Sequence, residues 1–321
     1  MDRRDALTEF AARLQGVRGR AKLDATAAAV FDAFAADGVD AVLLKGPALA
    51  RMLYAAGETR GYSDVDVLVD PAHLGRARTA LGRAGYVDVS DELGVVDVAG
   101  VVHDETWVGP DPDGHQMVDL HLRLPGAAAA PERVWAALAA GRTAIELAGR
   151  EVPVLGEAGL ALHLALHAAQ HGAGHEKGIV DLRLGLERWP EEVWLKASAL
   201  AAQIEAEAAF VTGLRLVGEG ERLAELLGLQ PDPRAEWAAA HRAARPRGAS
   251  HLDAFADAAG PLARAGVVRR ALLPRRAWIR TTYPWARGGA ARLAAGYGVH
   301  VLRAPLWALR AWLHRRRGQR A

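Results

Sequence analysis

The stretch GYSDVDVLVD, residues 61–70, decides the fold because two carboxylates interrupt a strand that is otherwise apolar. Side chains alternate between the two faces of a strand, so Asp64 and Asp66 share one face. The opposite face carries three valines that can pack in a core, Val65, Val67 and Val69. Keeping two neighbouring carboxylates ionised near a core is costly unless a cation balances them. Carboxylate oxygens are ligands that Mg²⁺ prefers, so the pattern predicts a metal site.

A second acidic strand offers a third ligand. In MVDLHLRL, residues 117–124, Asp119 and His121 share one face of the strand. If this strand lies beside the first one, Asp119 completes a cluster of three carboxylates. Two metal ions held by such a cluster clamp the attacking and leaving oxygens of a phosphoryl-type displacement. His121 is then a candidate to orient a ligand or the acceptor.

The residues upstream of the acidic strand are suited to phosphate. The apolar run VDAVLLKG, residues 39–46, predicts a buried strand that ends in Lys45 and Gly46. Pro47 then suits the first position of a helix. A helix N-terminus after a glycine favours phosphate through its free N–H groups and its dipole. Lys45 and Arg60 add positive charge where a triphosphate would lie.

The order of elements along the chain predicts an α+β protein. A helix over residues 22–37, the strand–helix–strand unit just described, a helix ending at Gly85 and a hairpin around GPDPDG follow one another. From residue 157 the apolar period becomes helical. Breaks interrupt it at Gly172–Gly178, Trp189–Pro190 and Pro231–Pro233. We therefore expect an α/β domain with an N-terminal helix over residues 1–150, a helical domain over 151–260 and a basic, aromatic-rich segment over 261–321.

The acidic strand and its surroundings match a known family. The stretch VLLKGPALARMLYAAGETRGYSDVDVLV, residues 42–69, resembles the uncharacterised nucleotidyltransferases of the polymerase-beta-like superfamily. Later stretches are also similar to the family: GRARTALGRAGY, VDLHLRL, LALHLALHAAQHG and GIVDLRLGLER. The likeness covers most of residues 40–215. It implies an α/β nucleotidyltransferase domain with a mixed sheet, followed by a helical domain.

The resemblance also implies an activity and its residues. The expected reaction moves a nucleoside monophosphate from an NTP to an unknown acceptor and releases pyrophosphate. By resemblance, the catalytic residues and ligands of two Mg²⁺ ions, for which Mn²⁺ is an alternative, are Asp64, Asp66 and Asp119. Asp119 is also expected to activate the acceptor. By the same resemblance, the nucleotide-binding residues are Lys45, Gly46 and Arg60.

One departure from the superfamily keeps two alternatives open. The superfamily usually has Gly-Ser or Gly-Gly where this chain has Gly46–Pro47, and proline offers neither a hydroxyl nor an N–H. The first alternative is an accessory protein that binds a nucleotide or another phospho-ligand without catalysis. The second alternative keeps the fold but transfers another phosphate-linked group, such as a sugar.

Histidines recur at helical spacing in the region that follows the α/β domain. His163, His167 and His171 are each four residues apart, and His175 follows Gly172. Such spacing can bind zinc. The alternative, which similar histidines in the family favour, is a cleft that contacts nucleotide or acceptor. We therefore expect His167, His171, His121 and Asp181 to line the acceptor side or the cleft, with a structural ion pair as the alternative for Asp181.

Composition bounds the remaining questions. The chain has no cysteine, which excludes disulfides and thiolate metal sites. It shows neither a signal sequence nor an apolar run long enough to cross a bilayer, so a cytoplasmic location is expected.

The C-terminal segment is strongly basic. From Arg264 to Ala321 there are 14 arginines and no other charged residue, so the net charge of the rest of the chain is 2 − 14 = −12. This segment interleaves arginine with tryptophan and tyrosine, for example in a helix expected over residues 305–317. An anionic membrane surface or nucleic acid is a candidate partner, and packing on an acidic protein surface is the alternative.

Overall fold

A computed structural model describes residues 3–90, 104–109, 116–233, 235–236, 251–252, 255, 260–274 and 276–318. The chain divides into two compact units. The first unit comprises Met1–Val87 and Trp107–Ala239, and the second comprises Asp88–Thr106 and Ala240–Ala321. The sheet strands β1, β2, β5, β6 and β7 and the helices α6 to α10 all belong to the first unit. The division at residues 150 and 260 stays a prediction.

The chain forms a mixed β-sheet, and five of its strands lie entirely in the first unit. Over the described residues it has seven strands in the order β3-β4-β5-β2-β1-β7-β6. The strands are β1 (Ala41–Leu43), β2 (Val65–Val69), β3 (Val87–Asp88), β4 (Asp104–Val108), β5 (Met117–His121), β6 (Thr143–Leu147) and β7 (Arg150–Val154). β1 is antiparallel to β2 and parallel to β7, whereas β2 is parallel to β5. The predicted α+β class with a mixed sheet is therefore confirmed.

β2 carries the acidic residue Asp66 and lies in the middle of the sheet, which explains why apolar residues surround this aspartate in its sequence. All five of its residues are buried. Val65, Val67 and Val69 lie in the hydrophobic core, and Leu68 is also fully buried. In the parallel register with β5, Asp66 lies opposite Asp119. The predicted pairing of the two acidic strands is thus confirmed, and it brings their carboxylates to one place on the sheet.

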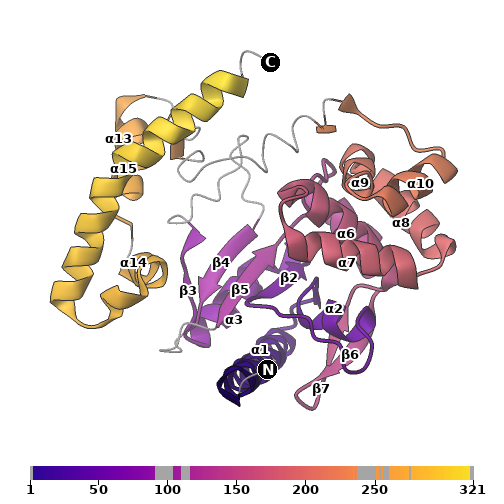
Figure 1. Ribbon diagram of the computed structural model, residues 1–321, viewed down its shortest axis with the longest axis horizontal. Helices are drawn as coiled ribbons and strands as arrows, with labels where there is room; N and C mark the ends of the chain where they lie inside the picture. The colour runs from indigo at the N-terminus through magenta and orange to yellow at the C-terminus, as the bar shows by residue number, and fades with distance from the viewer. Residues whose placement is uncertain are drawn as a thin grey trace. The chain divides into compact units, whose positions relative to one another are not determined.

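Helices before and within the sheet region cover it. They are α1 (Arg3–Ala36), α2 (Pro47–Met52), the 3-10 helix η1 (Pro71–His73), α3 (Leu74–Arg83) and α5 (Pro131–Ala139). α1 packs against α3 and against β2, β6 and β7 (Figure 1). Phe31 and Phe34 of α1 are buried in this interface. α2 is shorter than the expected helix, because it ends at Met52 rather than near Gly57.

The second half of the first unit is helical, as expected. Its helices are α6 (Glu157–His171), α7 (Glu176–Arg188), α8 (Glu191–Gln203), α9 (Glu207–Leu214) and α10 (Gly218–Leu226). α6 packs against α7, α8 and α9, so most of its residues are buried (Figure 1). The contact with α9 is very close, because a Cβ on Gly213 would lie 1.9 Å from the backbone oxygen of Ala165. This packing fixes α6, the helix that carries His163, His167 and His171. These three residues and His175 are called the histidine ladder below.

The sequence left three elements unpredicted, whereas two of its expected breaks coincide with helix ends. It did not predict α5 or the β6–β7 hairpin, whose two turn residues Ala148 and Gly149 both have positive φ. Such a two-residue turn usually carries Asn-Gly or Asp-Gly, so alanine in its first position hides it. The expected breaks at Gly172–Gly178 and Trp189–Pro190 coincide with the ends of α6 and α7. Most of the expected GPDPDG turn lies outside the described residues.

The second unit contains the basic segment. Its helices are α13 (Pro261–Leu272), α14 (Arg276–Thr282), the 3-10 helix η2 (Pro284–Arg287) and α15 (Ala290–Gly318). A small core of Ile279, Tyr283, Ala286 and Leu293 joins them. The expected helix over residues 305–317 is the second half of α15. None of the helices that the structure describes is both long and apolar enough to span a bilayer. The predicted membrane or nucleic acid contact of this segment stays a prediction, and no described contact supports it.

Candidate active site

Three carboxylates meet where β2 and β5 lie side by side. Asp64 precedes β2, Asp66 lies within it, and Asp119 lies opposite Asp66 on β5. One carboxylate oxygen from each of the three lies within 4.8 Å of the others. Asp66 is only 1% exposed, and Asp64 and Asp119 are half-buried. The expected cluster therefore exists, and it is partly shielded from solvent.

Asp66 is the most constrained member of this cluster. Its Oδ1 accepts from the ammonium of Lys45 at 2.9 Å and lies 3.1 Å from His121 Nε2. Burial alone would raise the pKa of Asp66, but the charge of Lys45 and the hydrogen bond from His121 outweigh it, so the pKa lies below the usual range. The other oxygen, Oδ2, is buried and has no hydrogen-bond partner among the described residues. A buried carboxylate oxygen without a partner is costly, which suggests a ligand for it.

The pKa values of two charged neighbours of Asp66, Asp64 and Lys45, are both raised. Burial, followed by the negative charge of Asp66, raises the pKa of Asp64. Burial works to lower the pKa of Lys45, yet the charges of Asp66 and Asp64 outweigh it and the pKa is raised. The carboxylates thus hold more negative charge than Lys45 alone balances. A divalent cation would relieve this excess.

The donor set fits a hard divalent metal. All three groups are carboxylates, whose oxygens suit Mg²⁺ or Mn²⁺. Their spacing lets one oxygen of each reach a common ion. One other group in the described part of the chain has comparable spacing, namely Asp40, Asp70 and His73. There, His73 Nδ1 accepts from the N–H of Asp40 and Asp70 Oδ1 caps η1 at Ala72, so these atoms already serve the local turn.

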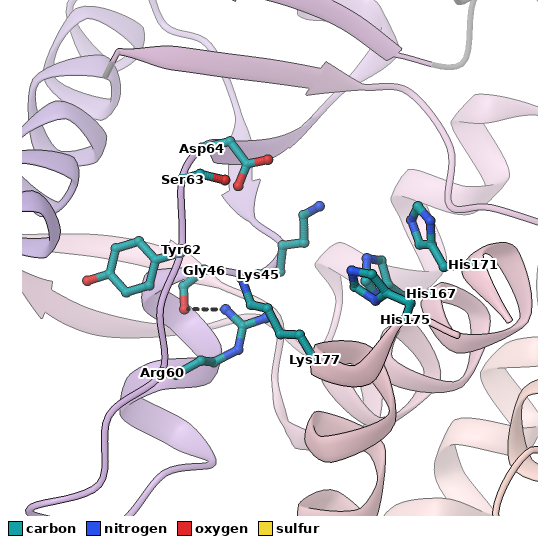
Figure 2. Close-up of a pocket in the computed structure, with 10 residues that line it drawn as sticks. All are labelled: Lys45, Gly46, Arg60, Tyr62, Ser63, Asp64, His167, His171, His175 and Lys177. Atoms are coloured by element: carbon teal, nitrogen blue, oxygen red, sulfur yellow. Dashed lines mark hydrogen bonds between the residues drawn. The ribbon is translucent and has the colours of Figure 1, made fainter. Parts of the chain in front are cut away.

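A pocket of about 220 Å³ opens beside Asp64. It is lined by Lys45, Gly46, Arg60, Tyr62, Ser63, Asp64, His167, His171, His175 and Lys177. Figure 2 shows the segment from Tyr62 to Asp64 on one side and the histidines on the other, with the side chains of Lys45 and Lys177 between them. The pocket thus brings together Asp64 of the expected metal ligands, all the residues expected for nucleotide and two of the expected cleft histidines, His167 and His171. The other two expected cleft residues, His121 and Asp181, are not among its lining residues.

Residues 4–222, which are more than half of the chain, match a protein-family model. That model is described as an uncharacterised nucleotidyltransferase. The chain belongs to this family. The resemblance seen in the sequence is therefore confirmed, and the site residues above all fall inside the matched range.

Comparison with solved structures finds proteins that match at low similarity. The antibiotic-resistance factor ANT(2'')-Ia is 15% identical with a TM-score of 0.40, over 57% of this chain and 93% of that one. The lincosamide antibiotic adenylyltransferase LnuA, bound to lincomycin, is 16% identical with a TM-score of 0.32, over 49% and 91%. An antigenic nucleotidyltransferase-like protein from Paracoccidioides brasiliensis is 13% identical with a TM-score of 0.35, over 68% and 96%. No curated protein matches the sequence.

The histidine ladder in this family member runs from the core to the pocket. The ring centroids of His163 and His167 are 5.8 Å apart, those of His167 and His171 are 4.5 Å apart, and those of His171 and His175 are 4.8 Å apart. Among the described residues, two groups bring three metal-binding atoms together, and neither includes a histidine of the ladder. The zinc interpretation therefore has no geometric support, whereas His167 and His171 do line the pocket.

His163 is the buried end of the ladder. It is 4% exposed, and neither of its ring nitrogens has a hydrogen-bond partner in the described part of the chain. Burial, and then the charge of Lys45, lowers the pKa of His163 to about 3. A neutral imidazole in this position is consistent with its apolar surroundings on α6.

Arg60 and Asp181 form a buried pair, which the sequence had placed on two sides of the site. The guanidinium donates to both Asp181 oxygens, with Nε at 2.9 and 3.0 Å and Nη2 at 2.7 Å. Tyr54 donates to the same carboxylate at 2.6 Å, and Arg60 Nη1 donates to the Gly46 carbonyl at 3.3 Å. Arg60 is 5% exposed and Asp181 is 1% exposed. Arg60 therefore connects the loop at Gly46 to helix α7. The Arg60 side chain also lines the pocket.

Four lining residues of the pocket were not among the expected site residues, namely Tyr62, Ser63, His175 and Lys177. Tyr62 and Ser63 precede the acidic pair, and Lys177 lies in the first turn of α7. The signal for Lys177 was its place in the break Gly172–Gly178, directly after the histidine ladder. Its approach to Lys45 depends on how α7 packs, which the local pattern does not contain.

The Arg60–Asp181 pair predicts a large stability effect. Replacing Arg60 by Met leaves the Asp181 carboxylate buried without its cation, which costs about 3–5 kcal/mol of unfolding free energy. The double variant R60M/D181L removes both charges and is expected to recover most of that loss. Urea unfolding followed by circular dichroism measures both. Arg142→Ala, at an exposed arginine of the same unit, is the control and should cost less than about 1 kcal/mol. An R60M loss as small as that of the control would contradict a stabilising pair.

His163 predicts a pH dependence of stability. Its pKa in the folded protein, about 3, lies below the ordinary histidine value of 6.5, so between these values the unfolded chain binds a proton that the folded chain does not. The stability from this neutral histidine is therefore complete above pH 6.5 and is lost as the pH falls toward 3, by up to about 1.4 kcal/mol per pH unit. Urea unfolding between pH 7 and pH 5 should show a smaller decline in His163→Leu than in wild type. Equal declines would contradict the assignment.

Proposed function

We propose that this protein transfers a nucleoside monophosphate from an NTP to an acceptor and releases pyrophosphate, with two Mg²⁺ ions held by Asp64, Asp66 and Asp119. The observation that carries the proposal is the position of three carboxylates, within 4.8 Å of one another, at the edge of a pocket lined by lysines and histidines. Cations bound by the carboxylates and an anionic substrate in the pocket would then be neighbours. Membership of a nucleotidyltransferase family supports the same reaction class.

Each carboxylate has a distinct part in this proposal. Asp64 lines the pocket and Asp66 belongs to the same carboxylate cluster, so the two would hold ions beside the phosphates. Asp119 lies on the far side of Asp66, on β5. From there it holds one ion and accepts the proton of the attacking group. When bound, the ions supply positive charge for the attacking and leaving oxygens.

Positive side chains hold the triphosphate in this proposal. α2 has only six residues and starts with a proline, so its first turn offers few N–H groups. Lys45 and Lys177 lie in the pocket and replace that contribution with ammonium groups. His121 contacts Asp66 and orients it. Arg60 holds Gly46 in place through its carbonyl, which keeps the loop beside the phosphates.

One observation favours a second candidate function. The ammonium of Lys45 already contacts Asp66 at 2.9 Å, so part of the negative charge is balanced within the protein. Together with Pro47, this favours an accessory protein that binds a nucleotide without transferring anything. The intact carboxylate cluster favours transfer, because a binder has no need to hold three acids together. Transfer of another phosphate-linked group, such as a sugar, would use the same carboxylates.

The proposal predicts a loss of activity when a metal ligand is neutralised. Purified protein is incubated with each of the four α-³²P-labelled NTPs, Mg²⁺ and fractionated metabolite and protein extracts, and labelled product and pyrophosphate are measured. Asp66→Asn and Asp119→Asn are each expected to lower transfer more than about 100-fold, since metal ligation supplies several kcal/mol to the transition state. Asp70→Asn, in the other acidic group, is the matched control and should transfer like wild type.

Two outcomes would overturn this proposal. Transfer that survives in both Asp66→Asn and Asp119→Asn would show that the cluster is not the catalytic centre. Mg²⁺-dependent NTP binding with no pyrophosphate release in any extract would favour the accessory protein.

A further inference from the structure

The wall of the pocket opposite Asp64 is built from nitrogen groups. α6 supplies His167 and His171, and the start of α7 supplies His175 and Lys177. Figure 2 shows these side chains converging on the same space as Lys45, with Asp64 on the far side. The lining residues of the pocket include many donors and one carboxylate, Asp64, a composition that suits an anion with several oxygens.

The cations of the pocket are unequally balanced. Lys45 pairs with Asp66, and Arg60 pairs with Asp181. Lys177 makes no hydrogen bond or ion pair with any residue that the structure describes. Burial, and then the charge of Arg60, lowers the pKa of Lys177. Because Lys177 lines the pocket and has no ion pair among the described residues, its ammonium can bind an anion there.

The histidines differ in what they can do. His175 Nδ1 accepts from the Gly178 N–H at 3.2 Å and caps α7, so a neutral His175 carries its proton on Nε2. His171 has no hydrogen bond to the described residues, and it lies in the last turn of α6, where a helix dipole favours a cation. Partial burial, and then the charges of His175 and Lys45, lowers the pKa of His171 to about 4, so it is neutral at pH 7 without an anion.

We propose that this pocket binds the terminal phosphates of an NTP, and the pyrophosphate that leaves, and that His171 takes up a proton from solvent as they bind. The proposal rests on the proposed function for the identity of the ligand, and on the pocket itself for the binding. The proton adds to a ring nitrogen of His171, which then donates a charge-assisted hydrogen bond to a phosphate oxygen. No covalent bond of the phosphate changes in this step.

The charged surroundings of His171 explain why binding and protonation are coupled. His167 and His175 lie next to it in the ladder, while Lys45, Arg60 and Lys177 supply positive charge and Asp64 supplies negative charge. α8 and α9 also pack on α6, and no residue of either lines the pocket. A polyphosphate adds several negative charges to this set. Its negative charge therefore opposes the effects of burial and of the neighbouring positive charges, which together keep His171 neutral.

Calorimetric titration with inorganic pyrophosphate tests this proposal on the full-length protein. The titration is performed at pH 7 with and without Mg²⁺, in PIPES and in Tris, whose different ionisation enthalpies reveal the number of protons taken up. Pyrophosphate has titrating oxygens of its own, so the decisive quantity is the difference between wild type and His171→Gln. We expect wild type to take up about one proton more than the variant and to bind about tenfold more tightly.

Two further variants separate charge from proton uptake. Lys177→Gln is expected to weaken binding about tenfold while the proton uptake stays as in wild type. His73→Gln replaces a histidine of the same unit that does not line the pocket, and it should match wild type in both quantities. Nitrogen-15 NMR of the histidine rings in the wild-type protein reports the same event without a mutation, as a change of the His171 ring to the doubly protonated form.

The outcomes distinguish this inference from the proposed function. Equal proton uptake in wild type and His171→Gln, or a His171 ring that stays neutral on saturation with pyrophosphate, would overturn the inference even if nucleotidyl transfer is found. Uptake that depends on His171 supports the inference, and it would do so even if no acceptor is ever labelled.

Discussion

The site depends on the burial of one carboxylate. Asp66 lies in the middle of a fully buried strand, and its Oδ1 contacts both the Lys45 ammonium and the His121 ring. An ionised carboxylate in such a place is stable only with opposite charge close by. Lys45 lies two residues after the end of β1 at Leu43, and β5 supplies His121 and Asp119 from the other side of β2. The pairing of three neighbouring strands, β1, β2 and β5, therefore places these partners around the Asp66 carboxylate.

The same lysine joins the acidic cluster to the pocket. Lys45 balances Asp66 and also lines the space in which the histidines and Lys177 meet. A metal ion at the carboxylates would compete with Lys45 for Asp66, and an anion in the pocket would offer Lys45 a new partner. Binding of both would thus move one ammonium from a carboxylate to a phosphate. The Arg60–Asp181 pair holds the loop at Gly46 to α7 while this exchange takes place.

Local pattern predicted the acidic cluster better than its surroundings. The period of two in residues 61–70 placed Asp64 and Asp66 on one face, and the same period in β5 placed Asp119, because alternation is a property of each strand alone. The partner of Arg60 was not predictable in this way, since Asp181 lies 121 residues away on a helix. The β6–β7 hairpin was missed because Ala148 gives no turn signal, although it adopts a positive φ. The Arg60–Asp181 pairing was thus missed because it depends on tertiary packing, whereas the hairpin was missed because its turn has an unusual residue.

A crystal structure of the wild-type protein with Mn²⁺ and a non-hydrolysable NTP analogue tests the central claim most directly. Anomalous scattering locates the manganese, and the density of the analogue locates its phosphates. The account predicts manganese bound to Asp64, Asp66 and Asp119, with the terminal phosphates against Lys177 and His171. Manganese at Asp40, Asp70 and His73 alone, or phosphates outside the pocket beside Asp64, would contradict it.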